Sequence, residues 1–409
     1  MTAALLVFAV TYLFISVQRI HVFHLNRPSA SLLGAVAMVV VAGLPLEEAY
    51  RAIDLDVLVF LLGVMLLVAY LEEGGFFEAA AAWILPRVRS PRQLLVVVTV
   101  GSGMLSALFV NDTVCLMLTP VLLATLGPLG LRPVPYLIAL AMGANIGSAL
   151  TIVGNPQNML VGLWSGIPFA TFAWRMLPVV VGGMVIACGV LLFLYRKELA
   201  GGMPGRVAVA RPAVDRPLVG TALLLFGTSL GAWLAGASLP LVAITAGALM
   251  IALGRRDPAP ALARVDWQLL LFFAALFVVM RGLSWSGAAD ALDRIALGAI
   301  APEAPVRSAV SVAAAMAALS NLISNVPAVV LWRNVVPTLP DPPRMWLVVS
   351  MSATLAGNLL LIGSMANLIV AERAEARGVR IGAWEYARAG IPVALLTIGW
   401  GLLVLLAGA

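Results

Sequence analysis

The chain has 409 residues, of which 62% are hydrophobic and only 11% are charged. Its mean hydropathy is +1.05, whereas a soluble globular domain carries about 25% charged residues. With 25 basic and 19 acidic side chains, the protein cannot cover a surface that faces water, so the composition excludes a soluble protein. The apolar runs are about 15–20 residues long and do not alternate, which predicts membrane-spanning helices rather than barrel strands.

The first predicted element is the apolar segment 1–17, which lacks the basic start and the small-residue cleavage site of a signal peptide. We interpret it as the first membrane span. In a membrane protein, a net charge of +6 usually reflects basic residues in cytoplasmic loops that face anionic headgroups. We therefore expect the lipid bilayer as a partner and do not expect nucleic-acid binding. Cys115 and Cys188 both lie in apolar stretches, which argues against a disulfide framework.

Most features of the chain occur twice in the same order. LSALFVNDT at 105–113 aligns with LSNLISNVP at 319–327, and VGNPQNMLVG at 153–162 aligns with IGSMANLIVA at 362–371. Each half then ends with an aromatic segment, a proline and a last apolar span. The offset between matched positions stays between 209 and 214 residues, which indicates an internal duplication.

We therefore predict an all-α polytopic membrane protein built from two repeats, residues 1–195 and 218–409, joined by a cytoplasmic linker at 196–217. Each repeat is expected to contain about five membrane spans, one re-entrant helical hairpin and one broken helix. An odd number of crossings makes the repeats inverted, which is a common plan of secondary transporters.

The same topology places both termini outside and the linker inside, in the inner (plasma) membrane of the cell. Most of the 25 basic residues then lie on the inner side, among them Arg27, Arg196 and Lys197. This distribution satisfies the positive-inside rule.

Two segments, 93–126 and 307–339, are too long for one span and too short for two spans of about 20 residues with a turn between them. A chain can turn at membrane depth only where protein or a wet cavity shields its backbone. We therefore predict a re-entrant hairpin in each segment, with Ser324 or Asn325 capping the returning helix of the second. The tips carry Asn111, Asp112 and Thr113 in the first hairpin, and Ser324, Asn325 and Val326 in the second.

Two further segments, about 134–164 and 346–375, are predicted as broken helices. The first runs into Gly-Asn-Pro-Gln-Asn and the second into Gly-Ser-Met-Ala-Asn. Glycine and proline interrupt the helix there and leave backbone N–H and C=O groups without helical hydrogen bonds. Polar side chains or a ligand can then pair with these groups. Broken helices at matching places in two halves indicate the binding site of a transporter. The polar residues at the breaks are Asn155 and Asn158 in the first half, and Ser364 and Asn367 in the second.

Asp112 is the one carboxylate that falls well inside a predicted membrane segment, and Val326 occupies the matching position of the second half. An aspartate at the bilayer centre costs about 2.5–3.5 kcal/mol on insertion scales. Two readings remain open: Asp112 caps the hairpin turn, or it couples transport to a proton or another cation. The asparagines likewise either satisfy the backbone at the turns or bind the solute.

We expect four helix N-termini to converge near mid-membrane, where they favour an anion or a strongly polar solute. The predicted solute- and ion-binding residues are Asn111, Asp112, Thr113, Asn155, Asn158, Ser324, Asn325, Ser364 and Asn367.

ALFVNDTVCLMLTPVLL at 107–123 and SNLISNVPAVVL at 320–331 resemble the two hairpins of bacterial arsenite permeases, and 357–386 is similar to the melanosomal P protein and citrate-type permeases. The resemblance is to the ion transporter superfamily. It implies two hairpins and two broken helices around one central site, elevator-like movement, and a scaffold for oligomerisation such as a homodimer. The divalent-anion sodium symporters carry Ser-Asn-Thr at both tips, whereas Asn-Asp-Thr at 111–113 is closer to the arsenite-permease branch.

The predicted function is secondary active transport of a small anion or an uncharged metalloid hydroxide, by proton-coupled efflux and without a bound cofactor. Sodium-coupled uptake of an anion such as a dicarboxylate, citrate or sulfate, with Na⁺ as the coupling ion, is the first alternative, and cation/proton antiport is the second. The sequence lacks a Walker loop, HExxH and CxxC pairs, and one buried aspartate does not make a membrane enzyme. No enzymatic activity and no metal site are therefore expected.

Overall fold

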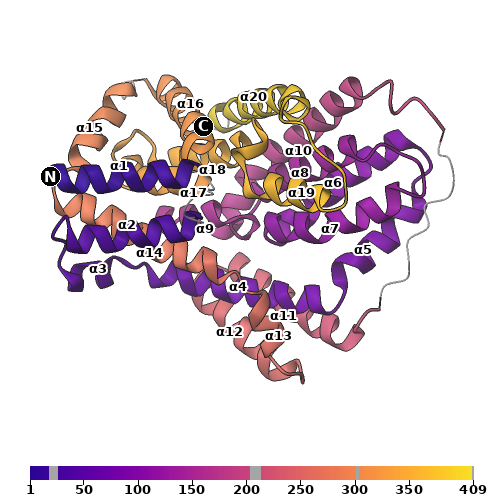
Figure 1. Ribbon diagram of the computed structural model, residues 1–409, viewed down its shortest axis with the longest axis horizontal. Helices are drawn as coiled ribbons and strands as arrows, with labels where there is room; N and C mark the ends of the chain where they lie inside the picture. Colours follow the sequence, from indigo (N-terminus) through magenta and orange to yellow (C-terminus); the bar gives the residue numbers. More distant parts are fainter. Residues whose placement is uncertain (18–25, 203–212, 301–303, 408–409) are drawn as a thin grey trace.

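The computed structural model describes residues 1–17, 26–202, 213–300 and 304–407, and every regular element in these ranges is a helix (Figure 1). Seven of these helices are long and apolar enough to cross a membrane: α4 (Leu55–Glu73), α6 (Pro91–Leu108), α10 (Phe169–Leu194), α11 (Arg216–Leu234), α14 (Trp267–Trp285), α16 (Pro305–Ile323) and α20 (Ala383–Ala407). The predicted all-α polytopic fold is confirmed. The inverted relation of the two halves and the path of the chain through the bilayer stay predictions.

Shorter helices complete the bundle. The apolar ones are α1 (Thr2–Val17), α2 (Arg27–Val40), α7 (Asn111–Leu126), α8 (Val134–Ser148) and α12 (Leu239–Leu253). The connecting ones are α3 (Leu46–Ala52), α5 (Phe76–Ile84), η1 (Leu85–Arg87), α13 (Ala259–Arg264) and α15 (Ala289–Ala299).

The backbone breaks lie where polar residues interrupt the apolar sequence. Only Phe109 and Val110 separate α6 from α7, and Ser324 separates α16 from α17 (Asn325–Leu331). The return from the second break is shorter than the return from the first, because α17 has seven residues and is followed only by η3 (Val336–Thr338).

The two broken helices have the same internal construction. In the first half, α8, η2 (Ile152–Gly154) and α9 (Pro156–Ser165) follow one another, and in the second half α18 (Pro342–Ala356), η4 (Leu361–Gly363) and α19 (Met365–Glu375) do the same. The residues that precede the two 3₁₀ turns have nearly equal torsion angles, φ −128° and ψ 162° at Thr151 against φ −127° and ψ 155° at Leu360. This likeness supports the predicted duplication.

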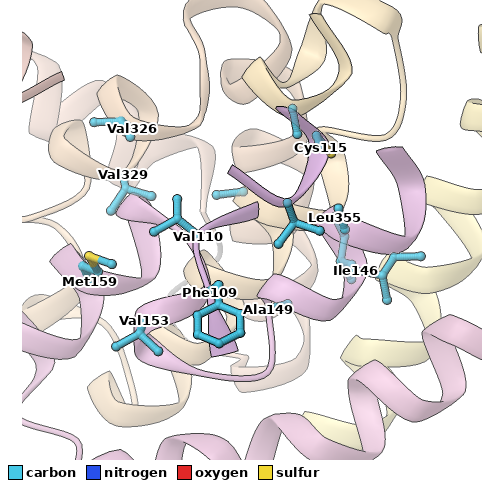
Figure 2. Close-up of a cluster of buried hydrophobic side chains, with 14 of the residues drawn as sticks. Phe109, Val110, Cys115, Ile146, Ala149, Val153, Met159, Val326, Val329 and Leu355 are labelled. Carbon is cyan, nitrogen blue, oxygen red and sulfur yellow. The ribbon is translucent and has the colours of Figure 1, made fainter. Parts of the chain in front are cut away.

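The halves of the chain pack into each other. The N-terminal α2 lies against α14, α4 against α12, and α10 against α20, while α19 lies against both α7 and α8 (Figure 1). Figure 2 shows the result near the first break, where Phe109, Val110 and Met159 gather with Val326 and Val329 of the second half. All five side chains are buried, so an apolar layer surrounds the polar breaks.

Glycines allow α6 and α8 to pack closely. A Cβ atom on Gly147 would lie 2.1 Å from the carbonyl oxygen of Gly103, and one on Gly143 would lie 2.2 Å from the carbonyl oxygen of Thr99. Backbone contact of this kind is typical of membrane helices, whose interfaces favour small residues.

We expect Gly147→Ala to destabilise the protein by about 1–3 kcal/mol, because the methyl group would collide with rigid backbone. Gly101→Ala on α6 is the matched control, since nothing lies within 4 Å of a Cβ at that position. Thermal unfolding in detergent checks both: the melting temperature should fall for Gly147→Ala and hold or rise for Gly101→Ala. Equal melting temperatures would contradict the proposed close contact.

Candidate functional site

A cavity of about 540 Å³ lies where the two tips and the two broken helices meet. Asn111 and Asp112 at the start of α7, Ser324 and Asn325 at the start of α17, and Ser364 before α19 all contribute to its lining. The structure thus brings five of the nine predicted site residues to one cavity. Pro156 and Gln157 from the first broken helix also line it.

The cavity runs from a buried floor to an exposed mouth. Asn111 and Ser364 are each 4% exposed, and Asn325 is 9% exposed. Asp266 and Glu372, which line the same cavity, are exposed. The cavity thus connects exposed acidic side chains with polar groups that are shielded from water.

Asn145 in α8 connects the floor residues to one another. Its Oδ1 accepts hydrogen bonds from Asn111 Nδ2 and Ser364 Oγ, both at 3.0 Å. Its Nδ2 donates to Asn358 Oδ1 at 2.9 Å and to Asn367 Oδ1 at 3.0 Å. One buried amide thus fixes the first tip against the second broken helix, so the protein itself holds the floor residues in position.

Asn158 and Asn367 hold the two breaks in the same way. Asn158 Nδ2 donates to the carbonyl oxygens of Ser148 and Thr151, at 3.0 and 2.9 Å. Asn367 Nδ2 donates to the carbonyl oxygens of Gly357 and Leu360, at 2.7 and 3.1 Å. In both halves the acceptors lie ten and seven residues before the asparagine, so the amide replaces bonds that the broken helix has lost.

Asn155 caps α9, because its Oδ1 accepts from Asn158 N at 2.8 Å. Its Nδ2 donates to Ser148 Oγ at 2.9 Å. The structure places four of the predicted site residues away from the cavity wall: Thr113, Asn155, Asn158 and Asn367. The last three belong to the hydrogen-bonded support behind the wall, and Thr113 is half-buried on α7.

Asp112 is not the cap of its helix. The N-cap position of α7 is Val110, no side chain caps it, and Asp112 is the acidic residue of the first turn. The carboxylate lines the cavity instead. This geometry favours a role of Asp112 toward the cavity contents over a role in the turn, although an acid in the first turn also interacts favourably with the helix dipole.

The expected cap of the second returning helix does not form. Ser324 occupies the N-cap position of α17 but has φ 80° and ψ 157°, and no side-chain capping bond is present. Asn325, with its amide group turned to donate, reaches the carbonyl oxygens of Ala353 at 3.2 Å and Gly363 at 3.3 Å. The expectation that Ser324 or Asn325 caps this helix is therefore wrong, because Asn325 satisfies neighbouring backbone and Ser324 lies in a strained turn.

A second cavity, of about 620 Å³, lies at the other ends of the same helices. On α14, Phe272 lines the first cavity and Phe277 the second, and on α17 Val326 lines the first and Val330 the second. At the second cavity, Asp54 Oδ2 accepts a hydrogen bond from Nε1 of Trp164, near the end of α9, at 3.0 Å. The two cavities thus open from opposite ends of the bundle.

The polar wall that α2 and α14 contribute was not among the predicted site residues. Arg27, Gln268 and Asp266 line the first cavity, yet in the sequence they stand beside loops, where headgroup contact is the ordinary expectation. Gln157 is 4% exposed and also lines the cavity. Its position within the Gly-Asn-Pro-Gln-Asn break could have indicated from the sequence that Gln157 lies at the site.

Comparison with known proteins identifies the family. The sequence of the chain matches the citrate transporter family (CitMHS) over residues 7–343. The chain belongs to this family. It is therefore a transporter rather than an enzyme, in agreement with the resemblance to the ion transporter superfamily.

Individual relatives align over most of their lengths. The silicon efflux transporter LSI3 of Oryza sativa subsp. japonica is 30% identical, with 92% of each chain covered. The inner membrane protein YbiR of Escherichia coli (strain K12) is 32% identical over 87% of this chain and 89% of its own. The putative transporter arsB of Dictyostelium discoideum is 24% identical over 96% of this chain and 90% of its own.

A solved structure shares the fold. The YdaH transporter of Alcanivorax borkumensis superimposes with a TM-score of 0.56 over 99% of this chain and 96% of its own, at 16% sequence identity. At this identity the likeness speaks for the fold alone.

Proposed function

We propose that this transporter exports a small oxygen-rich solute, an inorganic or small organic anion or an uncharged metalloid hydroxide, in exchange for protons. The observation that carries the proposal is the cavity floor, where Asn111, Asp112, Asn325 and Ser364 come together from both halves of the chain. Amide and hydroxyl groups match the hydrogen-bonding needs of such solutes. The names of two relatives, a silicon efflux transporter and a putative arsB transporter, support this class.

The proton is the proposed coupling ion because Asp112 lines the cavity without capping its helix. Burial disfavours the charged form of a carboxylate, so exposure to water on one side and burial on the other would change its proton occupancy. Sodium-coupled anion uptake is the alternative. The name of the citrate transporter family supports an organic anion as the solute, but it names neither the coupling ion nor the direction.

Binding tests the solute class first. Thermal unfolding of the purified protein would be recorded with arsenite, silicate, sulfate, phosphate, citrate and a dicarboxylate, each with and without sodium, since a solute that binds the folded state raises the melting temperature. We expect arsenite or silicate to stabilise the protein in the absence of sodium. Stabilisation by citrate or a dicarboxylate that requires sodium would favour the alternative.

The two cavities suggest the transport cycle. We infer that the solute sits at the floor of the first cavity and reaches the second when the tips and broken helices move as one body, as in an elevator. The supporting observation is that Asn145, Asn158 and Asn367 tie α7, α8, α9, α18 and α19 together through buried hydrogen bonds.

The proposed topology places the termini outside and the linker in the cytoplasm, and the surplus of basic residues in the inner loops supports it. We expect Gly201→Cys, in a protein without its two native cysteines, to resist an impermeant thiol reagent added to intact cells and to react after the cells are opened. Labelling of Gly201→Cys from outside intact cells would reverse the proposed orientation.

A further inference from the structure

Among the described residues that line the first cavity, the one arginine is Arg27, the first residue of α2. The neighbouring polar residues of the wall that α2 and α14 contribute are occupied by local bonds. Asn26 Oδ1 accepts from Ser29 N at 3.0 Å, and Asn26 Nδ2 donates to Gln268 Oε1 at 3.4 Å. Asp266 Oδ1 accepts from Leu269 N at 2.9 Å. These bonds fix the start of α2 against the start of α14, and they leave Arg27 facing the cavity.

The guanidinium of Arg27 is incompletely satisfied. Its Nε is buried and has no hydrogen-bond partner within the described part of the chain. A buried donor without a partner destabilises a fold unless a ligand or water completes it. Arginine presents its donors in a planar fork that matches a pair of oxygen atoms, so an oxygen-bearing group suits this guanidinium as a partner.

Arg27 and the cavity floor belong to different packed groups of helices. Arg27 starts α2, which packs against α1 and α14. Of the floor residues, Asn111 starts α7, Asn325 starts α17 and Ser364 immediately precedes α19, while α7 packs against α8 and α19. A solute in the cavity would therefore be held from both sides.

We propose that Arg27 is a solute-binding residue, which donates from the α2 wall to oxygen atoms of a solute held on its other face by Asn111, Asn325 and Ser364. This assignment rests on the proposed function. It adds a positively charged donor to the solute contacts, which the polar residues of the two tips do not provide. It also makes binding depend on the relative position of the two helix groups, because movement of the floor would separate the solute from Arg27.

The same wall limits the charge of the solute. Asp112, Asp266 and Glu372 line the cavity together with Arg27. Among the described residues that line the cavity, three carboxylates thus outnumber one guanidinium, so a multiply charged anion would be repelled, whereas an uncharged hydroxide or a singly charged oxyanion would not. Arg27 therefore supplies donors for an oxygen-rich solute, while the carboxylates limit that solute to at most one negative charge.

Equilibrium binding to the purified full-length protein tests the assignment, with arsenite, silicate and citrate as probes. We expect arsenite or silicate to bind at least tenfold more tightly than citrate, and Arg27→Gln to weaken that binding at least tenfold. Arg27→Lys keeps the positive charge but lacks the planar guanidinium group. Its affinity for arsenite or silicate should therefore fall between those of the unaltered protein and Arg27→Gln. Arg92→Gln, at an exposed position of α6, is the matched control and should bind as the unaltered protein does.

Chemical rescue keeps the test independent of folding defects in Arg27→Gln. Arg27→Cys, in a Cys188→Ser background, should regain solute binding after modification with a positively charged aminoethyl thiosulfonate, but not after modification with a neutral reagent of similar size. Bound solute should also slow the modification.

Each outcome separates the inference from the proposed function. If Arg27→Gln binds the probes as tightly as the unaltered protein does, while Ser364→Ala or Asn325→Ala does not, Arg27 is not a solute ligand and the proposed function stands. Tightest binding of citrate would overturn the charge limit. If no probe binds to the unaltered protein, the proposed function itself fails.

Discussion

Asp112→Asn is expected to abolish transport driven by a pH gradient while leaving solute binding in place. The amide has nearly the shape of the carboxyl group and keeps most of its hydrogen-bonding capacity, but it cannot take up or release a proton. In proteoliposomes, accumulation of arsenite or silicate under an imposed pH gradient should fall at least tenfold. Exchange of labelled against unlabelled solute, which needs no net proton movement, should continue.

Asp266→Asn provides the matched control for Asp112→Asn. Asp266 also lines the cavity, but it is exposed and caps α14 through Leu269 N at 2.9 Å. Asparagine is an equally good N-cap, so this variant should remain stable and retain gradient-driven accumulation. Full accumulation by Asp112→Asn would show that the coupling ion binds elsewhere.

The second large effect is expected for Asn145→Leu. The substitution keeps the approximate volume of the side chain but removes the partner of Asn111, Ser364, Asn358 and Asn367 at once. Each buried polar group left without a partner costs about 1–3 kcal/mol. We expect a loss of at least about 3 kcal/mol in stability, together with loss of solute binding, because the floor is no longer held in position.

Ser352→Ala is the matched control for Asn145→Leu. Ser352 is fully buried in α18, and its Oγ has no hydrogen-bond partner among the described residues. Its removal therefore breaks no bond and should leave the melting temperature and the affinity unchanged. Thermal unfolding in detergent, with and without solute, measures both variants. A melting temperature for Asn145→Leu equal to that of Ser352→Ala would contradict the role of Asn145 as the centre of the network.

The helix breaks could be predicted from the sequence because their chemistry is local. Asn111-Asp112-Thr113 inside a long apolar run leaves the chain no way to continue as an ordinary span, and Gly154 with Pro156 interrupts any helix. The same patterns pointed to Asn111, Asp112, Asn325 and Ser364, which the structure brings to one cavity; their role in solute binding stays a prediction.

The sequence could not separate the residues that line the cavity from those that support it. Asn155, Asn158 and Asn367 have the same residue type and the same place at a break as Asn111, yet their amides satisfy carbonyl groups that the breaks release. The distinction depends on torsion angles at Thr151 and Leu360, which set where each released carbonyl points.

The wall opposite the tips depends on tertiary packing alone. Arg27 follows a loop and precedes Pro28, a pattern that on its own indicates a helix start near the headgroups. Only the packing of α2 against α14 brings its side chain to the cavity.

The pH inside sodium-free proteoliposomes, followed with an enclosed dye after arsenite or silicate is added outside, tests the central claim most directly. If the solute bound between the two tips exchanges for protons, its entry will remove protons from the lumen, and the internal pH will rise in step with solute uptake. The rise should be absent in liposomes that contain Asp112→Asn. Solute uptake by the unaltered protein without any change of internal pH, or uptake only after sodium is added, would contradict proton exchange at this site.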